Sequence, residues 1–213
     1  MRPVKLVSDT IDKADVKALV KWLDTPFGIP TPQLTKGPVT PVFEKKFSDW
    51  LGTKHSVFVN SGSSAILLGL AALKFGGKLK NDTIIVPDLS WATDVSSPLM
   101  LGLNPILIDA NDEDLSVDLN RLEWIFKREK PAAFILVSVL GLVPDMDRIV
   151  ELCDEYDVLL IEDVCESMGS EYKGKKLGTF GCMSFFSLYY GHHISTIEGG
   201  MVCTSDEEIH DLL

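Results

Sequence analysis

The sequence has few of the features that mark membrane, metal-binding and disulfide-rich proteins. No window approaches about 18 unbroken apolar residues, and the N-terminus has no apolar segment like that of a secretory signal. No C-x-x-C spacing links the four cysteines, which are Cys153, Cys165, Cys182 and Cys203. This pattern predicts neither a zinc site nor a disulfide framework. We therefore expect a cytoplasmic protein with reduced cysteines and no metal.

Positive charge is also scarce. The 20 Lys and Arg residues are outnumbered by 31 Asp and Glu residues, and the formal net charge is -11. Nucleic-acid binding requires clustered Lys and Arg to meet the phosphates, so we expect no nucleic-acid partner. Internal repeats and low-complexity tracts are absent too. A hydrophobic content of 46% over 213 residues is enough for one sizeable core.

Short apolar segments alternate with amphipathic ones from residue 56 onward. The pattern predicts strands at 56–59, 83–86, 104–108, 133–139 and 158–161, and helices at 65–75, 118–128 and 146–156. Two more strands are predicted between Cys182 and Cys203. Because the strands are apolar on both faces, helices must cover both sides of the sheet. The predicted fold class is therefore α/β, with a mostly parallel sheet flanked by helices.

The N-terminal part has a different character. Apolar spacing predicts a helix at 10–23, and five prolines make 25–41 an extended segment. This segment is either a plain connector or an arm that reaches a neighbouring subunit. A helix at 41–51 then ends at Gly52. We divide the chain into an N-terminal helix with its extended segment, 1–36, and a large domain, 37–213.

The last residues, SDEEIHDLL, predict a helix with Ser205 as N-cap and Glu208 three residues later. The chain stops inside that helix. We expect a fragment or a truncated reading frame that lacks a C-terminal small domain, and a naturally short protein is the alternative.

One candidate ligand site lies between a strand and a helix, at Ser61-Gly62-Ser63-Ser64. A helix N-terminus offers unpaired N–H groups and a positive dipole, which suit a phosphate. Gly62 lets the backbone approach a ligand closely. Serine-rich helix starts are also common as simple N-caps, so the motif alone leaves both interpretations open.

Three further segments contain residues suited to a flat, cationic ligand. Asp163 ends an apolar strand, where ligands of parallel sheets bind, although it can also cap the next helix. Trp91 follows another strand and can stack on an aromatic ring or simply fill the core. His192 and His193 lie between aromatic residues and a glycine pair, in a loop that is either functional or structural.

Six stretches then connect these sites. They are GPVTPVFEKKFSDWLGTKHSVFVNSGSSAILLGLAAL, VPDLSWATDV, GLNPILIDAN, GLVPDMDRI, IEDVCESMGSEYKGKKLGTFG and FFSLYYGHHISTIEGGMVCTSDEE. In order, and over nearly the whole chain from residue 37, they resemble the DegT/DnrJ/EryC1/StrS family. The resemblance implies the fold-type I large domain and a pyridoxal phosphate or pyridoxamine phosphate cofactor. It also implies nucleotide-linked keto sugars as substrates, in deoxysugar synthesis for lipopolysaccharide O-antigen.

The resemblance also implies roles for individual residues. Gly62 and Ser63 would hold the cofactor phosphate through backbone amides, and Ser187 would add a hydroxyl. Asp163 would pair with the ring nitrogen, and Trp91 would stack on the ring. Near the ring hydroxyl, where the family's aminotransferases often carry Gln or His, this sequence has Glu166.

The main departure from the family pattern is His192, which stands where aminotransferases carry the lysine that bonds to the cofactor. The last lysine of the chain is Lys176, so no small shift of register supplies another. Imidazole forms no stable Schiff base but can transfer protons near neutral pH. The sequence therefore resembles the histidine-containing sugar 3-dehydratases of the family. The resemblance implies His192 as acid and base, glutamate as amino donor, and a homodimer.

Three alternatives remain. The first is an iron–sulfur-dependent 3-dehydratase of CDP-linked sugars, with Cys165 as one ligand and the others beyond residue 213. The second is a sugar aminotransferase with its lysine elsewhere, and the third is a catalytically silent binding module.

Overall fold

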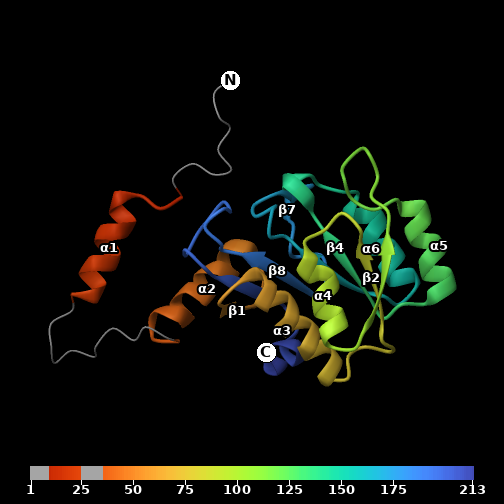
Figure 1. Ribbon diagram of the computed structural model, residues 1–213, viewed down its shortest axis with the longest axis horizontal. Coiled ribbons are helices and arrows are strands. Elements are labelled where there is room, and N and C mark those ends of the chain that lie inside the picture. The colour runs from red at the N-terminus through yellow and green to blue at the C-terminus, as the bar shows by residue number, and fades with distance from the viewer. Residues whose placement is uncertain (1–9, 25–35) are drawn as a thin grey trace.

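The computed structural model describes residues 10–24 and 36–213 (Figure 1). The N-terminal half of this region contains α1 (Lys13–Leu23), α2 (Val39–Leu51), β1 (His55–Val59), α3 (Gly62–Phe75), β2 (Thr83–Pro87), α4 (Ala92–Met100) and β3 (Asn104–Ile108). The remainder contains α5 (Leu119–Glu129), β4 (Ala133–Val137), the 3-10 turn η1 (Val139–Gly141), α6 (Met146–Glu155), β5 (Leu159–Asp163), β6 (Glu171–Tyr172), β7 (Lys175–Lys176), β8 (Met183–Ser187), β9 (Gly200–Thr204) and α7 (Glu207–Leu212).

Seven strands form one sheet in the order β1-β9-β8-β5-β4-β2-β3. The pairs from β8 through β3 are parallel, and β9 is antiparallel to both of its neighbours. Strands β6 and β7 form a separate two-stranded ribbon. The mostly parallel α/β sheet predicted from the sequence is thus confirmed, and it brings the carboxyl ends of β2, β4, β5 and β8 to one edge.

Helices cover both faces of the sheet, as Figure 1 shows. One core cluster joins α2, α5 and α6 to the sheet, and the other joins α3 and α7 to the opposite face. Strand β2 shows the alternation, because Ile85 belongs to the first cluster while Ile84 and Val86 belong to the second. Every residue of β4, β8 and β9 is buried, as expected for strands packed on both faces.

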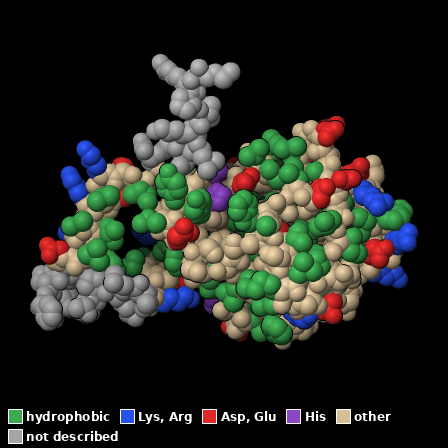
Figure 2. All heavy atoms as spheres, in the orientation of Figure 1, with side chains coloured by type: hydrophobic (Ala, Val, Ile, Leu, Met, Phe, Trp, Pro, Cys, Tyr) green, Lys and Arg blue, Asp and Glu red, His purple; other side chains and the backbone are tan. Residues whose placement is uncertain are grey.

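Some predicted boundaries shift. The strand predicted at 133–139 ends at Val137, because the backbone turns through η1, where Leu140 has a φ of 53°. The predicted helix at 10–23 is confirmed as α1, which has no buried residue and shows hydrophobic side chains on its surface in Figure 2. Most of the proline-rich segment predicted at 25–41 lies outside the described residues. No helix in the described part of the chain is long and apolar enough to cross a membrane.

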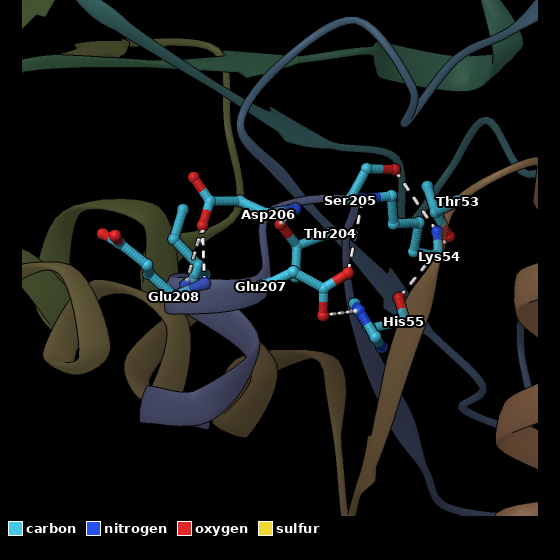
Figure 3. Close-up of polar contacts among 9 residues, drawn as sticks. Thr53, Lys54, His55, Thr204, Ser205, Asp206, Glu207 and Glu208 are labelled. Atoms are coloured by element: carbon cyan, nitrogen blue, oxygen red, sulfur yellow. Dashed lines mark hydrogen bonds and ion pairs between the residues drawn. The ribbon is translucent and has the colours of Figure 1, made fainter.

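The start of α7 corrects one prediction (Figure 3). The N-cap is Asp206, whose carboxylate accepts hydrogen bonds from the backbone N–H groups of Glu208 and Ile209, at 2.8 and 3.1 Å. Ser205 instead accepts a hydrogen bond from the N–H of Lys54, at 3.3 Å. The predicted Ser205 cap is therefore wrong, because that hydroxyl ties the end of β9 to the residue before β1 and is not available to the helix.

Candidate active site

The predicted site residues come together at the carboxyl edge of the sheet. Asp163 and Ser187 are the last residues of the neighbouring strands β5 and β8. Gly62 begins α3, and Trp91 directly precedes α4. Ligands of open parallel sheets bind at this edge, so the topology alone creates a candidate pocket there.

Asp163 is held in place by the backbone around it. Its side chain is 3% exposed, and Oδ1 accepts a hydrogen bond from the N–H of Cys165, at 2.9 Å. Its own carbonyl accepts a hydrogen bond from the N–H of Ser138, at 3.0 Å. Burial raises the pKa of the Asp163 carboxyl, while hydrogen bonds from Cys165 oppose the shift. A cationic ligand group beside it would favour the ionised form.

Gly62 is required because there is no room for a side chain at this position. A Cβ there would lie 2.8 Å from the Cβ of Ser187 and 3.2 Å from the Sγ of Cys165. Gly200, on β9, is under the same constraint, since a Cβ there would lie 2.2 Å from the carbonyl oxygen of Ser61. The two glycines therefore let the N-terminus of α3 pack directly against the ends of β8 and β9.

The first turn of α3 keeps backbone donors free. Ser61 is its N-cap, and Ser61 Oγ accepts a hydrogen bond from the N–H of Ser64, at 3.0 Å. The N–H of Ala65 donates to the carbonyl of Ser61. Within the described ranges, the N–H groups of Gly62 and Ser63 have no such partner. Two amides and the helix dipole thus remain available for an anion.

His192 lies in the loop between β8 and β9 and is half-buried. Its N–H donates to the carbonyl of Tyr189 at 3.0 Å, and the two rings meet edge to face with centroids 6.0 Å apart. Burial lowers the pKa of the imidazole, and the carboxyl groups of Glu166 and Asp163 both act to raise it. The ring therefore lies within electrostatic reach of the predicted ligand residues and is mostly neutral at neutral pH.

Glu166 and Trp91 border the same region. The Oε2 of Glu166 accepts a hydrogen bond from the N–H of Leu140, at 3.1 Å, which links the turn after β5 to η1. Trp91 is 69% exposed, so its indole is not part of the core. Leu140, which follows β4, and Tyr189 and Tyr190, which follow β8, are also exposed and leave apolar surface at the carboxyl edge of the sheet. The core interpretation of Trp91 is therefore wrong, and the ring is free to cover a ligand.

Sequence reasoning missed Asp94, in the first turn of α4. The residue is fully buried, and neither carboxyl oxygen has a hydrogen-bond partner among the described residues. Its carboxyl interacts with that of Asp163. The only sequence signal was an acidic residue three positions after Trp91, in a segment whose other face is apolar. First-turn acids are common at helix starts, so that signal did not indicate burial.

Another cluster of possible metal ligands lies elsewhere. Among the described residues, His55, Glu207 and His210 have ligand atoms within 4.8 Å of one another. His55 begins β1 and so lies at the edge of the sheet opposite to the candidate site. Its Nε2 bonds Glu207 at 2.7 Å, and its ring stacks on that of His210 at 3.9 Å and 8° (Figure 3 shows the first contact). Parallel rings direct their nitrogen lone pairs in separate planes, so this arrangement favours stacking over shared coordination of one ion.

Cys165 was the candidate cluster ligand. Its thiol packs near Gly62, and burial raises its pKa well above the usual value, with Asp163 and Asp94 adding to the shift. Metal clusters bind thiolates, which this acidic, buried setting disfavours. The environment of Cys165 therefore matches that of a pocket wall.

An α/β domain with a helix N-terminus, a buried carboxylate and a histidine at one sheet edge defines the class of fold-type I cofactor domains. The DegT/DnrJ/EryC1/StrS aminotransferase family model matches residues 16–213, so the chain belongs to this family. GDP-4-keto-6-deoxy-D-mannose 3-dehydratase of Yersinia pseudotuberculosis is 38% identical over 211 residues, which are 98% of this chain and 52% of that protein. The chain thus spans about half the length of such curated relatives.

Solved structures show the same similarity. Escherichia coli GDP-4-keto-6-deoxy-D-mannose-3-dehydratase with bound hydrated pyridoxal phosphate superposes with a TM-score of 0.90 and 37% identity, covering 99% of this chain and 53% of that one. A GDP-4-keto-6-deoxymannose-3-dehydratase with a trapped geminal diamine of pyridoxal phosphate and glutamate gives a TM-score of 0.86 and 36% identity, covering 99% and 54%. These matches confirm the predicted family and fold.

Proposed function

We propose that this chain is the cofactor-binding domain of a pyridoxal phosphate-dependent 3-dehydratase acting on a nucleotide-linked 4-keto-6-deoxyhexose, with GDP-4-keto-6-deoxymannose as the first candidate substrate. The observation that carries the proposal is the position of His192, which interacts with both Asp163 and Glu166 where no lysine is present. The similarity to two GDP-4-keto-6-deoxy-D-mannose 3-dehydratases at 37–38% identity supports the same substrate class.

The residues of the site fit the cofactor. Because Gly62 has no Cβ, the start of α3, with the free amides of Gly62 and Ser63, can lie close to Ser187. This arrangement suits a phosphate. Buried Asp163 suits a protonated ring nitrogen, and exposed Trp91 suits the ring face. Glu166 would lie near the ring hydroxyl. When bound, the cofactor would supply an amine that condenses with the sugar ketone and a ring that withdraws electrons.

The proton chemistry is assigned to His192. Its lowered pKa keeps the imidazole neutral near pH 7, so it can accept a proton from carbon as a base. Once protonated, it can return the proton to the departing C3 hydroxyl as an acid. Glu166 and Asp163 would stabilise the imidazolium in between, because each favours its charged form.

The proposed reaction consumes one glutamate for each sugar. Glutamate is the amino donor, and its oxidation to 2-oxoglutarate and ammonia provides two electrons. The C3 hydroxyl leaves as water, so the sugar product is lighter by one oxygen atom. A solved relative that holds glutamate bonded to pyridoxal phosphate supports this donor.

We also propose that the enzyme is a cytoplasmic homodimer. Exposed apolar side chains near the site, including Trp91, Leu140, Tyr189 and Tyr190, leave a surface that solvent alone covers poorly. A second subunit would cover this surface and exclude water from the pocket. Light scattering after size-exclusion chromatography tests the assembly, and a monomer at all concentrations would contradict it.

The activity is tested by incubating the protein with pyridoxal phosphate, glutamate and GDP-4-keto-6-deoxymannose. We expect 2-oxoglutarate and ammonia in equal amounts, and a sugar lighter by one oxygen atom in the mass spectrum. An aminotransferase would instead replace the keto oxygen with an amino group and release no ammonia. Turnover that requires iron would support the iron–sulfur alternative.

His192→Asn tests the role of the imidazole, because it keeps a planar, polar side chain but removes its acid and base function. This variant should bind pyridoxal phosphate yet lose nearly all turnover, by at least 100-fold. Undiminished turnover would remove His192 from the mechanism while leaving the family assignment intact.

A further inference from the structure

Asp94 is a buried acid that the proposed mechanism leaves unused. It lies in the first turn of α4, just after the exposed Trp91, and its side chain is 0% exposed. Neither carboxyl oxygen has a hydrogen-bond partner within the described part of the chain, and neither does the nearby hydroxyl of Thr93. A buried carboxylate without a donor is costly, so its protonation state must differ from that of a surface aspartate.

The groups that face Asp94 are themselves acidic. The carboxyl of Asp163, at the end of β5, is the charged group that acts most strongly on Asp94. Asp94 also interacts with the thiol of Cys165. Glu166 adds negative charge near Asp163, and the half-buried imidazole of His192 lies within reach of Asp163. Among the described residues, no Lys or Arg is one of the main groups that act on Asp94 or Asp163. The site therefore holds more buried negative charge than it can neutralise.

Two adjacent buried carboxyl groups share a proton when no cation is present to balance them. The hydrogen bonds decide which one is protonated. Asp163 accepts a hydrogen bond from the N–H of Cys165, at 2.9 Å, which stabilises its ionised form. The backbone N–H of Trp91 opposes the rise in the pKa of Asp94, but it acts less than burial and Asp163 do. Within the described residues no donor meets hydrogen-bond geometry at either oxygen of Asp94, so its ionised form is the less stable of the two. Two ionised carboxylates can only accept hydrogen bonds, but a protonated Asp94 can donate one to Asp163.

We propose that Asp94 is a positioning residue that stays protonated at neutral pH and donates a hydrogen bond to the carboxylate of Asp163, so that the pair carries a single negative charge. Burial, followed by the charge of Asp163, raises the pKa of Asp94 to about 9, which supports this assignment from the geometry.

The consequence for the cofactor rests on the function proposed above. A carboxylate that accepts a hydrogen bond from an acid is a weaker base than a free one. Asp163 would therefore leave the shared proton on the ring nitrogen, where it makes the ring a better electron acceptor. Ionisation of Asp94 would remove this donor, strengthen Asp163 as a base and draw the proton away from the ring. Asp94 thus acts on the ring through Asp163.

The proton can be observed directly by infrared spectroscopy of the protein without cofactor. The difference spectrum between wild type and Asp94→Asn should contain the C=O band of a protonated carboxylic acid at neutral pH, which disappears above about pH 9. Asp88→Asn is the matched control, because Asp88 is exposed and lies between β2 and α4, six residues before Asp94. That variant should retain the band. Absence of the band from the wild-type spectrum at neutral pH would overturn the proposal.

A second measurement uses pyridoxal phosphate. The band should persist when the cofactor binds, because the ring nitrogen pairs with Asp163 and leaves Asp94 protonated. Loss of the band on binding would mean that Asp94 gives up its proton, which contradicts the proposal. The absorbance of the bound cofactor should change with pH near 9 in wild type but not in Asp94→Asn.

Affinity separates hydrogen bonding from packing. Asp94→Asn keeps a donor and should bind pyridoxal phosphate within about twofold of wild type, whereas Asp94→Ala removes the donor and should bind about tenfold more weakly. Equal affinity of all three proteins would overturn the positioning role. If wild type fails to bind pyridoxal phosphate at all, the proposed function fails, while the infrared band still tests the shared proton.

Discussion

Replacing Gly62 with alanine tests the phosphate site at its most restricted point. The new Cβ would lie 2.8 Å from the Cβ of Ser187, whereas ordinary van der Waals contact begins at 3.4 Å. Ser187 Cβ belongs to a buried strand and cannot rotate away, so the start of α3 must move. The required shift is the difference between 3.4 and 2.8 Å, or about 0.6 Å.

The expected magnitudes differ for stability and binding. Alanine is favoured over glycine in helices by up to about 1 kcal/mol, whereas overpacking costs about 1–3 kcal/mol, so the net destabilisation is about 0–2 kcal/mol. A hydrogen bond to a charged group contributes about 1.5–3 kcal/mol, so weakening one amide contact should reduce affinity for pyridoxal phosphate about 10- to 100-fold. The variant should therefore fold almost normally and bind poorly.

Fluorescence titration with pyridoxal phosphate and urea unfolding measure the two quantities separately. Gly77→Ala is the matched control at the other end of α3, where φ is +70° and no atom lies within 4 Å of the new Cβ. That variant should lose about 1 kcal/mol of stability through backbone strain and keep its affinity. If Gly62→Ala is folded and binds as tightly as wild type, the phosphate does not lie at this helix start.

Four other substitutions follow from the same geometry. His192→Lys should become covalently attached to pyridoxal phosphate after borohydride reduction, as detected by mass spectrometry, and an unmodified protein would mean that residue 192 does not reach the cofactor. Folding raises the pKa of Asp94 to about 9, so the buried carboxyl lowers the free energy of unfolding by an amount that grows as pH rises from about 4. Asp94→Asn should therefore raise the urea midpoint at neutral pH, and this gain should vanish toward pH 4; a gain that is independent of pH would argue against ionisation as its cause. Glu162→Ala should lower stability by at least about 3 kcal/mol, because the carboxylate accepts hydrogen bonds from three backbone N–H groups in the turn before β8, and a smaller loss would mean that water replaces it. The pKa of the exposed Glu207 is lowered by contacts with Lys54 and His55, so its contribution is lost as pH falls through the folded pKa; Glu207→Gln should make urea unfolding slightly less sensitive to acid.

The alternation of buried strands and helices was visible in the sequence because both elements bury regular patterns of apolar residues. The positions of Asp163 and Gly62 in the fold were predictable for a related reason, because Asp163 ends a strand and Gly62 begins a helix. The cap of α7 was not, because Ser205 and Asp206 are both good capping residues and only the contact with Lys54 decides between them. Local sequence does not contain that tertiary contact.

Asp94 illustrates a deeper limit of sequence reasoning. An acidic residue in the first turn of a helix normally faces solvent and stabilises the helix dipole. Its burial depends on how α4 packs against α3, β2 and β3. The same packing lets its carboxyl interact with that of Asp163, about 70 positions away in the chain. Strand positions could be predicted from the pattern of apolar residues, but the interaction between two acids on different elements could not.

The loop that carries His192 is consistent with acid and base work. The N–H of Leu188 donates to Gly199 O at 2.8 Å, and the N–H of Thr196 donates to Leu188 O at 3.0 Å, so the loop is closed at its base. A lysine at residue 192 would be fixed by its bond to the cofactor, whereas an imidazole must be held by the protein alone. The contact between the ring of His192 and that of Tyr189 supplies part of this support. Under the proposed function, the backbone amides of Gly62 and Ser63 and the carboxylate of Asp163 would retain the cofactor without a covalent link. The close packing at Gly62 and Gly200 would then hold the start of α3 in place for the phosphate.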